Sequence, residues 1–302
     1  MKIIDVHAHI AQYIAGFTSR GELRAIGQGK AQYSTGETFQ MFPREMGDVS
    51  VSPEALLKVM DENGVEKAVL LQGNWLGFQN EYTYEAVRKF PNRFVGAATY
   101  DPFCVNVELI KKHLFDELGF KIVKFELSNG SGLMANRPPV YLDGTVMNGC
   151  FAHAREKGLT VVLDIGRPRN PCWQVDALAS VILKYPQINF VICHLLAPQR
   201  DDGELLKEAL RKLVAPNVYF DIAALAHNQK PESYPYPTAV EHLKNAKSIV
   251  GAERLMFGSD MPCTLTRESY QNLVNYVIYG GVFTKSELAD VFYNTADKVF
   301  FG

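Results

Sequence analysis

The sequence predicts a single-domain (β/α)8 barrel, a TIM barrel in which helices surround eight parallel strands. Two observations predict this fold. Eight short segments are apolar at almost every position, and segments with a helical pattern separate each one from the next. Strands that are apolar on both faces are typical of parallel sheets covered by helices. Eight strand–helix units also suit a chain of 302 residues, which can bury one large core.

The first strand lies within residues 1–9, and a long insertion over residues 11–50 follows it. This insertion is rich in Gly, Gln, Ser and Thr and shows little periodicity, so we expect a lid, a pocket wall or a partly disordered segment. Ser52 and Pro53 then begin the first helix, because Ser is a good N-cap and Pro suits the first helical position. Asn63-Gly64 ends that helix.

Strands and helices alternate through the rest of the chain. The further predicted strands cover residues 68–71, 94–98, 121–126, 159–164, 188–193, 218–221 and 254–257. The further predicted helices cover 79–90, 105–118, 145–157, 174–185, 203–213, 238–249, 267–279 and 285–299, and a Gly/Pro loop covers 128–144. The alternative fold, an open doubly wound sheet, gains no support, since no Gly-x-Gly-x-x-Gly motif follows strand 1. We therefore expect one domain over residues 1–302.

Composition narrows the class of protein. Hydrophobic residues make up 47% of the chain, charged residues 21%, and the net charge is −2, which is ordinary for a globular protein and gives no basis for nucleic-acid binding. No signal peptide or membrane-spanning stretch is recognised. The five cysteines are scattered without a Cys-x-x-Cys pair, which indicates reduced thiols and a cytoplasmic location. A homo-oligomer is expected on general grounds.

Titratable residues gather where the predicted strands end. His7 and His9 are two apart on strand 1, so their side chains share a face and could act as neighbouring metal ligands. The carboxyl ends of the strands build the active site of a (β/α)8 barrel. Polar residues stand at five further strand ends, namely Lys124 and Glu126, Asp164 followed by Arg167, His194, Asp221, and Asp260.

Three motifs resemble the amidohydrolase superfamily. His7-x-His9 opens the chain, Ile-Cys-His-Leu occupies 192–195, and Phe-Gly-Ser-Asp-Met-Pro occupies 257–262. The closing run Tyr-Asn-Thr-Ala-Asp-Lys-Val-Phe at 293–300 is also similar. Within the superfamily, the chain resembles the amidohydrolase-related family that includes aminocarboxymuconate semialdehyde decarboxylase and related metal-dependent hydrolases.

The resemblance implies one divalent metal ion, usually zinc, held by His7, His9, a histidine on strand 5 and Asp260, with His194 working beside the metal. This sequence departs from the pattern because Asp164 stands where the family has its strand-5 histidine. Three alternatives stay open. Asp164 is an oxygen ligand, which would make Mn²⁺ a candidate besides Zn²⁺; it hydrogen-bonds His7 or His9; or the site works without a metal.

The expected roles follow. Asp260 is a metal ligand and general base, and His194 polarises the substrate carbonyl or stabilises developing charge. Lys124 forms an ion pair with Glu126 or binds a substrate carboxylate. Arg167 is a candidate for an anionic group, and His227, beyond strand 7, for contact with the substrate.

The leading functional hypothesis is a hydrolase that attacks a small carboxylated ester, lactone or amide with metal-activated water. The alternative is a metal-dependent nonoxidative decarboxylase of a small unsaturated or aromatic carboxylate. A metal-free hydrolase and a non-catalytic binding barrel are further alternatives. The substrate itself is not readable, since specificity in barrels lies on loops.

Overall fold

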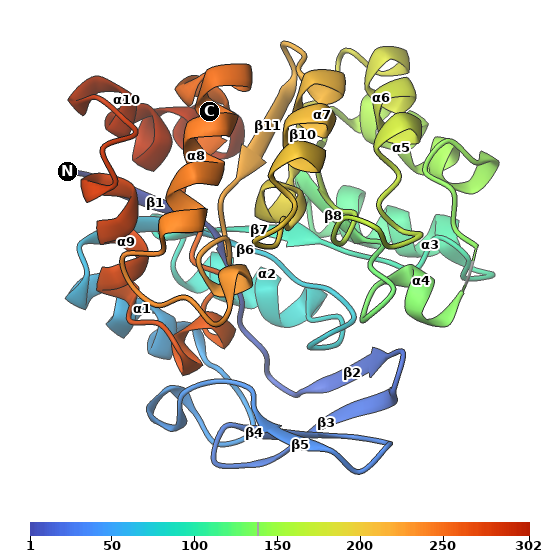
Figure 1. Cartoon of the computed structure of the whole chain (residues 1–302). Helices are drawn as coiled ribbons and strands as arrows, with labels where there is room; N and C mark the ends of the chain where they lie inside the picture. Colours follow the sequence, from blue (N-terminus) through green and yellow to red (C-terminus); the bar gives the residue numbers. More distant parts are fainter. Residues whose placement is uncertain (138) are drawn as a thin grey trace.

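The computed structural model describes residues 1–137 and 139–302 and confirms the barrel (Figure 1). Its eight strands pair in parallel in the order β1-β6-β7-β8-β9-β10-β11-β12. They are β1 (Ile3–Ala8), β6 (Val65–Leu70), β7 (Phe94–Ala98), β8 (Ile122–Glu126), β9 (Thr160–Asp164), β10 (Phe190–Ile192), β11 (Val218–Asp221) and β12 (Leu255–Met256). The segment after β12 closes the barrel against β1, since Val6 N donates to Phe257 O at 3.0 Å and His9 N to Met261 O at 2.9 Å.

Helices cover the outside of the barrel. They are α1 (Pro53–Glu62), α2 (Asn80–Lys89), α3 (Val107–Lys111), α4 (Leu133–Asn136), α5 (Thr145–Lys157), α6 (Val175–Lys184), α7 (Gly203–Leu213), α8 (Pro237–Val250), α9 (Tyr270–Tyr279) and α10 (Lys285–Ala289). Ser52 caps α1 as expected, accepting a hydrogen bond from Ala55 N. Within the described part of the chain, none of the helices is long and apolar enough to cross a bilayer.

Three helix predictions need correction. The helix expected over 105–118 begins as α3 and widens into a π-helix over Lys112–Glu117, where Leu118 N bonds to His113 O, five residues back. The helix expected over 285–299 likewise passes from α10 into π-helical turns. The helix expected from 267 starts at Tyr270, because the Ser269 side chain caps it by accepting from Asn272 N.

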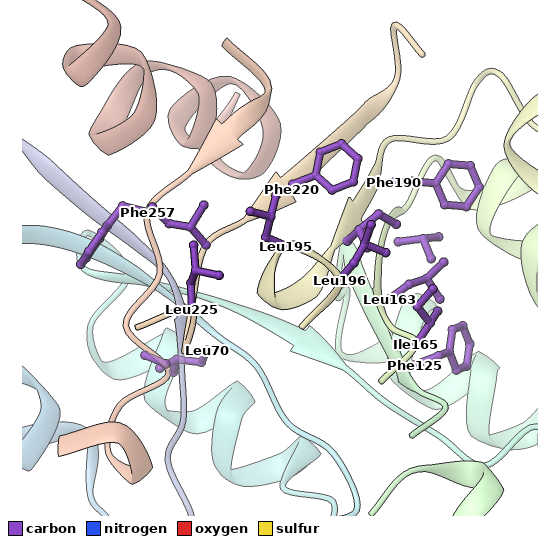
Figure 2. Packing of buried hydrophobic residues seen from close by; sticks show 14 of the residues in the cluster. Leu70, Phe125, Leu163, Ile165, Phe190, Leu195, Leu196, Phe220, Leu225 and Phe257 are labelled. Carbon is purple, nitrogen blue, oxygen red and sulfur yellow. The ribbon is translucent and has the colours of Figure 1, made fainter. Parts of the chain in front are cut away.

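Alternating strand residues form two apolar layers. Inward-facing residues such as Ile4, Val69 and Val162 fill the barrel interior. Outward-facing ones pack under the helices, and Figure 2 shows part of this layer, with Phe125, Phe190 and further apolar side chains on successive strands. The C-terminal segment contributes Val299 to the inner layer, and Val299 O lies 3.4 Å from the hydroxyl of Thr160, the first residue of β9. The C-terminal segment therefore covers the end of the barrel opposite the carboxyl ends of the strands.

The insertion over residues 11–50 is ordered, and it forms a four-stranded antiparallel sheet. The strands are β2 (Ala15–Thr18), β3 (Gly21–Gly27), β4 (Lys30–Tyr33) and β5 (Thr38–Gln40). This sheet stands apart from the outer helices in Figure 1. The sequence did not reveal it because the buried positions of β2 are Gly16 and Thr18, which leave no hydrophobic alternation.

The inserted sheet is fixed to the loop after β6. Phe17 N donates to Asn74 O at 2.9 Å, and Ala15 N donates to Leu76 O at 3.2 Å. A Cβ at Gly16 would clash with Trp75 O, so this close backbone approach requires glycine. Of the three expectations for the insertion, the fold supports a pocket wall, because Trp75 also lines the cavity at the carboxyl ends of the barrel strands.

Asp5 ties β1 to the segment that closes the barrel. Its Oδ1 accepts from His7 N at 3.1 Å and Ser259 N at 2.9 Å, and its Oδ2 accepts from the Tyr270 hydroxyl at 2.9 Å. Complete burial raises the pKa of this carboxyl to about 6.

Asp5→Ala is expected to lower the free energy of unfolding by about 3 kcal/mol, because buried donors lose their acceptor. Asp5→Asn keeps an acceptor oxygen and removes the charge that is costly to bury, so it is expected to stay within about 1 kcal/mol of the native chain. Urea denaturation followed by circular dichroism measures both. An equal loss in the two variants would contradict this role for the hydrogen bonds.

Candidate active site

The predicted site residues come together at the carboxyl ends of the strands. A cavity of about 240 Å³ is lined there by His7, His9, Lys124, Glu126, Asp164, His194 and Asp260. An outer cavity of about 440 Å³ adjoins it, shares Glu126, Asp164, His194 and Asp260, and is also lined by Arg167 and His227. The residues assigned a site role from the sequence therefore border one continuous space, whereas Asp221 lines neither cavity, and the chemical roles remain predictions.

A register irregularity brings the two strand-1 histidines into this cavity. The pairing of β1 with β6 shifts between Asp5 and Ala8, so Val6 packs in the barrel interior while the next residue, His7, also faces the cavity. The rings of His7 and His9 lie 5.0 Å apart between centroids. The two side chains share a face, as expected from their spacing.

Each of these histidines has one nitrogen engaged outside the cavity. His7 Nδ1 lies 3.0 Å from Asp221 Oδ2, and His9 Nδ1 lies 2.8 Å from Leu71 O. A carbonyl and a carboxylate only accept, so both Nδ1 atoms donate and the Nε2 atoms are the ones directed inward. Burial lowers the pKa of His7 well below its usual value, so this ring is neutral. Its buried Nε2 has no hydrogen-bond partner among the described residues.

Asp260 completes a compact group with the two histidines. Its Oδ1 lies 2.9 Å from His9 Nε2 and 3.7 Å from His7 Nε2. A single proton can join His9 to the carboxylate, but it leaves His7 Nε2 as a further acceptor with no donor. A divalent cation would satisfy all three atoms, and histidine nitrogens with a carboxylate oxygen are ligands that Zn²⁺ accepts. The donor set therefore fits a metal ion.

The backbone holds Asp260 in a left-handed conformation with φ +60°, and its N–H donates to His7 O at 2.8 Å. Asp tolerates this region better than most residues. Burial acts to raise the pKa of Asp260, but the hydrogen bond with His9 and the neighbouring imidazoles of His7 and His194 hold it below its usual value. The carboxylate is therefore ionised at neutral pH.

His194 stands at the end of β10 in a left-handed stretch, with φ +58°. Its N–H donates to Asp221 Oδ1 at 2.8 Å, and its Nδ1 lies 3.1 Å from Ala223 O. Its Nε2 lies in the cavity, 3.7 Å from Asp164 Oδ2. Burial lowers the pKa of His194, but the carboxylates of Asp164, Asp260 and Asp221 outweigh it and raise the pKa overall.

Asp221 is the site residue whose role sequence reasoning missed. Its Oδ2 contacts the imidazole of His7 and its Oδ1 accepts from the backbone N–H of His194, so one buried carboxylate orients the His7 ring and holds the backbone at His194. The place of Asp221 at the end of a predicted strand marked it as a candidate. Nothing in the sequence indicated its partners, because His7 is 214 positions away and His194 is 27 positions away. Asp221, and not Asp164, is the hydrogen-bond partner of His7.

Asp164 is separate from the compact group of His7, His9 and Asp260. Its Oδ1 accepts from Gly166 N at 2.7 Å, while Oδ2 faces His194. Asp164 still borders the cavity, so its assignment as a metal ligand remains a prediction.

Lys124 and Glu126 do not form the ion pair that their spacing suggested. Glu126 Oε1 instead accepts from the hydroxyls of Ser128 and Ser131. Among the described residues, the ammonium of Lys124 has neither a hydrogen bond nor an ion pair, although its side chain is buried. Burial acts to lower the pKa of Lys124, but Cys193, Glu126, Asp164 and Asp260 raise it overall, so Lys124 is a cation facing the cavity.

The chain is a parallel eight-stranded barrel with two histidines at the end of strand 1 and an aspartate after strand 8, all facing one cavity. This arrangement is typical of (β/α)8-barrel enzymes with the active site at the carboxyl ends of the strands. A family model described as amidohydrolase matches residues 4–302, and the chain belongs to this family. Members of the family are enzymes, either hydrolases or decarboxylases. A search of curated protein sequences found no match.

Solved structures show the same fold. A probable 2-pyrone-4,6-dicarboxylic acid hydrolase from Acinetobacter baumannii, with citric acid bound, is 17% identical with a TM-score of 0.71, and the match covers 100% of both chains. An amidohydrolase from Burkholderia multivorans with bound zinc is 17% identical with a TM-score of 0.72 over 99% of both chains. A 5-carboxyvanillate decarboxylase from Sphingomonas paucimobilis is 15% identical with a TM-score of 0.57, covering 81% of this chain and 82% of that one.

Proposed function

We propose that the protein is a metal-dependent hydrolase of a small carboxylated ester, lactone or amide. One observation carries this proposal. His7 Nε2, His9 Nε2 and Asp260 Oδ1 converge at the cavity, two of them from rings whose other nitrogen is already engaged. These two nitrogens and one carboxylate oxygen are all acceptors, so a bound cation would supply the positive charge that they lack.

His7, His9 and Asp260 would hold the ion, with Asp164 as a candidate for a further oxygen ligand from across the cavity. A divalent ion bound there would lower the pKa of a water molecule and polarise the carbonyl group of the substrate. Zn²⁺ suits the imidazole nitrogens, and Mn²⁺ is the second candidate if Asp164 binds. The zinc-bound structure from Burkholderia multivorans supports zinc as the first ion to test.

The side chains around the ion have distinct tasks. Asp260 is ionised and accepts the proton of the attacking water. His194 reaches the cavity through Nε2 and, when protonated, donates to the carbonyl oxygen as negative charge develops.

Lys124 is the counter-ion for the substrate carboxylate, because it is a buried cation without a protein partner among the described residues. Glu126 receives hydrogen bonds from the side chains of Ser128 and Ser131 and shapes the wall beside Lys124. Arg167 and His227 border the outer cavity, where the remainder of the substrate would extend.

A second reaction, nonoxidative decarboxylation, has support from the same cation. A carboxylate bound at Lys124 lies in the cavity that also contains His194 and Asp260. His194, when protonated, can pass a proton to carbon as CO₂ leaves, and Asp260 can do so once it has taken up a proton. A decarboxylase is also among the structures that share this fold.

A substrate screen tests the proposal. Lactones, esters and aromatic carboxylates are incubated with the Zn²⁺- or Mn²⁺-loaded protein, and products are identified by mass spectrometry and CO₂ release. We expect addition of water without CO₂. Release of CO₂ without water addition would replace the hydrolase with the decarboxylase, and no turnover in any class would favour a binding barrel.

A further inference from the structure

We propose that the groove between the inserted sheet and the barrel binds a planar, negatively charged part of the substrate that extends out of the catalytic cavity. The inference deepens the proposed function and rests on it for the identity of the ligand as a substrate. It assigns a binding role to the insertion over residues 11–50.

The groove is continuous with the active site. It has a volume of about 570 Å³ and lies between residues 33–41 of the inserted sheet and residues 227–230 and 263–266 of the barrel loops. Trp75 and Cys263 line both the groove and the inner cavity. His227 lines both the groove and the outer cavity. A molecule with its reacting group near Asp260 can therefore extend past Trp75 into the groove.

The wall of the groove is aromatic. The rings of Tyr33 and Phe39 lie 5.1 Å apart at an interplanar angle of 22°, which is a stacked pair. Both rings contact Trp75, with centroid distances of 6.0 Å from Tyr33 and 5.7 Å from Phe39. All three residues are only partly buried. Rigid aromatic surfaces of this kind favour a flat ligand, because stacking adds to the gain from apolar burial.

The charge in the groove is positive. Glu37 is neutralised by Arg20, which also lies 5.0 Å over the ring of Tyr33. Lys230 lines the groove and makes no ion pair with any described residue. Its pKa is lowered by partial burial and by the nearby Arg267, and these effects outweigh the carboxylate of Glu268, so the cations around Lys230 are only partly balanced. An anionic ligand supplies the balancing charge.

His227 adds a neutral polar wall. Burial and the neighbouring Lys230 lower the pKa of His227 to about 4, so the ring carries no charge at neutral pH. Its Nδ1 is buried and has no hydrogen-bond partner among the described residues. The combination of flat aromatic faces, a lysine without an ion pair among the described residues and a neutral imidazole selects a conjugated anion over an aliphatic or cationic group.

Isothermal titration calorimetry with naphthalene-2-carboxylate tests the groove on the metal-loaded protein. Phe39→Ala and Lys230→Gln are each expected to weaken binding about tenfold, from loss of the ring face and of the cation respectively. Phe17→Ala is the matched control, because Phe17 is exposed on the same sheet outside the groove, and it should not change the affinity. The neutral naphthalene-2-carboxamide should be insensitive to Lys230→Gln.

Three results would overturn the proposal: no binding by the native chain, equal binding by the native chain and both groove variants, or binding lost only in Asp260→Asn. The last result would place the probe in the catalytic cavity. None of these measurements depends on turnover. A chain that binds the probe in the groove but hydrolyses nothing would refute the proposed function and leave the groove site standing.

Discussion

Asp260→Asn is expected to lower kcat/KM by about 10³-fold. The carboxylate contacts His9 at 2.9 Å and borders the space where the substrate would react. An asparagine has nearly the same shape, but it cannot accept a proton from the attacking water and it removes a negative charge from the metal group. A 10³-fold loss corresponds to about 4 kcal/mol of transition-state stabilisation.

Steady-state kinetics on the substrate found by the screen, with metal content measured on the same samples, checks this expectation. Asp143→Asn is the matched control, because Asp143 is exposed in the loop before α5 and makes no side-chain contact with the site. It should keep native activity. Native turnover in Asp260→Asn would rule out the general-base role.

Removal of the metal by a chelator is expected to lower turnover by about 10³-fold, and added Zn²⁺ or Mn²⁺ should restore it. The reason is that His7, His9 and Asp260 present only acceptor atoms to one another. The protein purified without chelator should contain about one equivalent of a divalent metal. Substoichiometric metal together with full activity in EDTA would establish the metal-free alternative.

Metal affinity should also depend on Asp221, the residue that orients the His7 ring. Asp221→Asn is expected to weaken metal binding between 10- and 100-fold, because the amide is a poorer acceptor for His7 Nδ1–H and no longer holds the ring by charge. Competition with a chelator of known affinity measures the loss. His113→Gln is the control, since His113 is an exposed residue that contacts Glu81 and does not line the cavity. Equal affinities in the two variants would contradict the positioning role.

The fold was predictable because the apolar residues of each barrel strand indicate that both of its faces are buried. Segments such as 161–163 are apolar on both faces, and a chain that alternates eight such strands with helices has few other ways to bury them. Helix boundaries were predictable where a local cap decides them, as Ser52 does for α1. They were not predictable where the helix widens into π turns at 112–117 and 290–294.

The inserted sheet lay beyond sequence reasoning. Its strands are three to seven residues long and rely on pairing with one another and with the backbone of residues 74–76. Its buried positions include Gly16, Thr18 and Ala31, so no hydrophobic period marks them. Contacts between backbones leave no pattern in the sequence of side chains. For this reason the sequence predicted no strands in residues 11–50.

The sequence by itself determined which residues could carry chemistry, because a barrel places the carboxyl ends of all its strands at one rim. His7, His9, His194 and Asp260 were identifiable on that ground alone. Only the tertiary structure decided their partners: Asp221 bonded to the His7 ring and to the backbone of His194, Asp164 opposite His194, and Lys124 without a partner among the described residues instead of bonded to Glu126. Those choices depend on ångström-scale distances between different strands, and strand periodicity specifies the face of a side chain without specifying its neighbour.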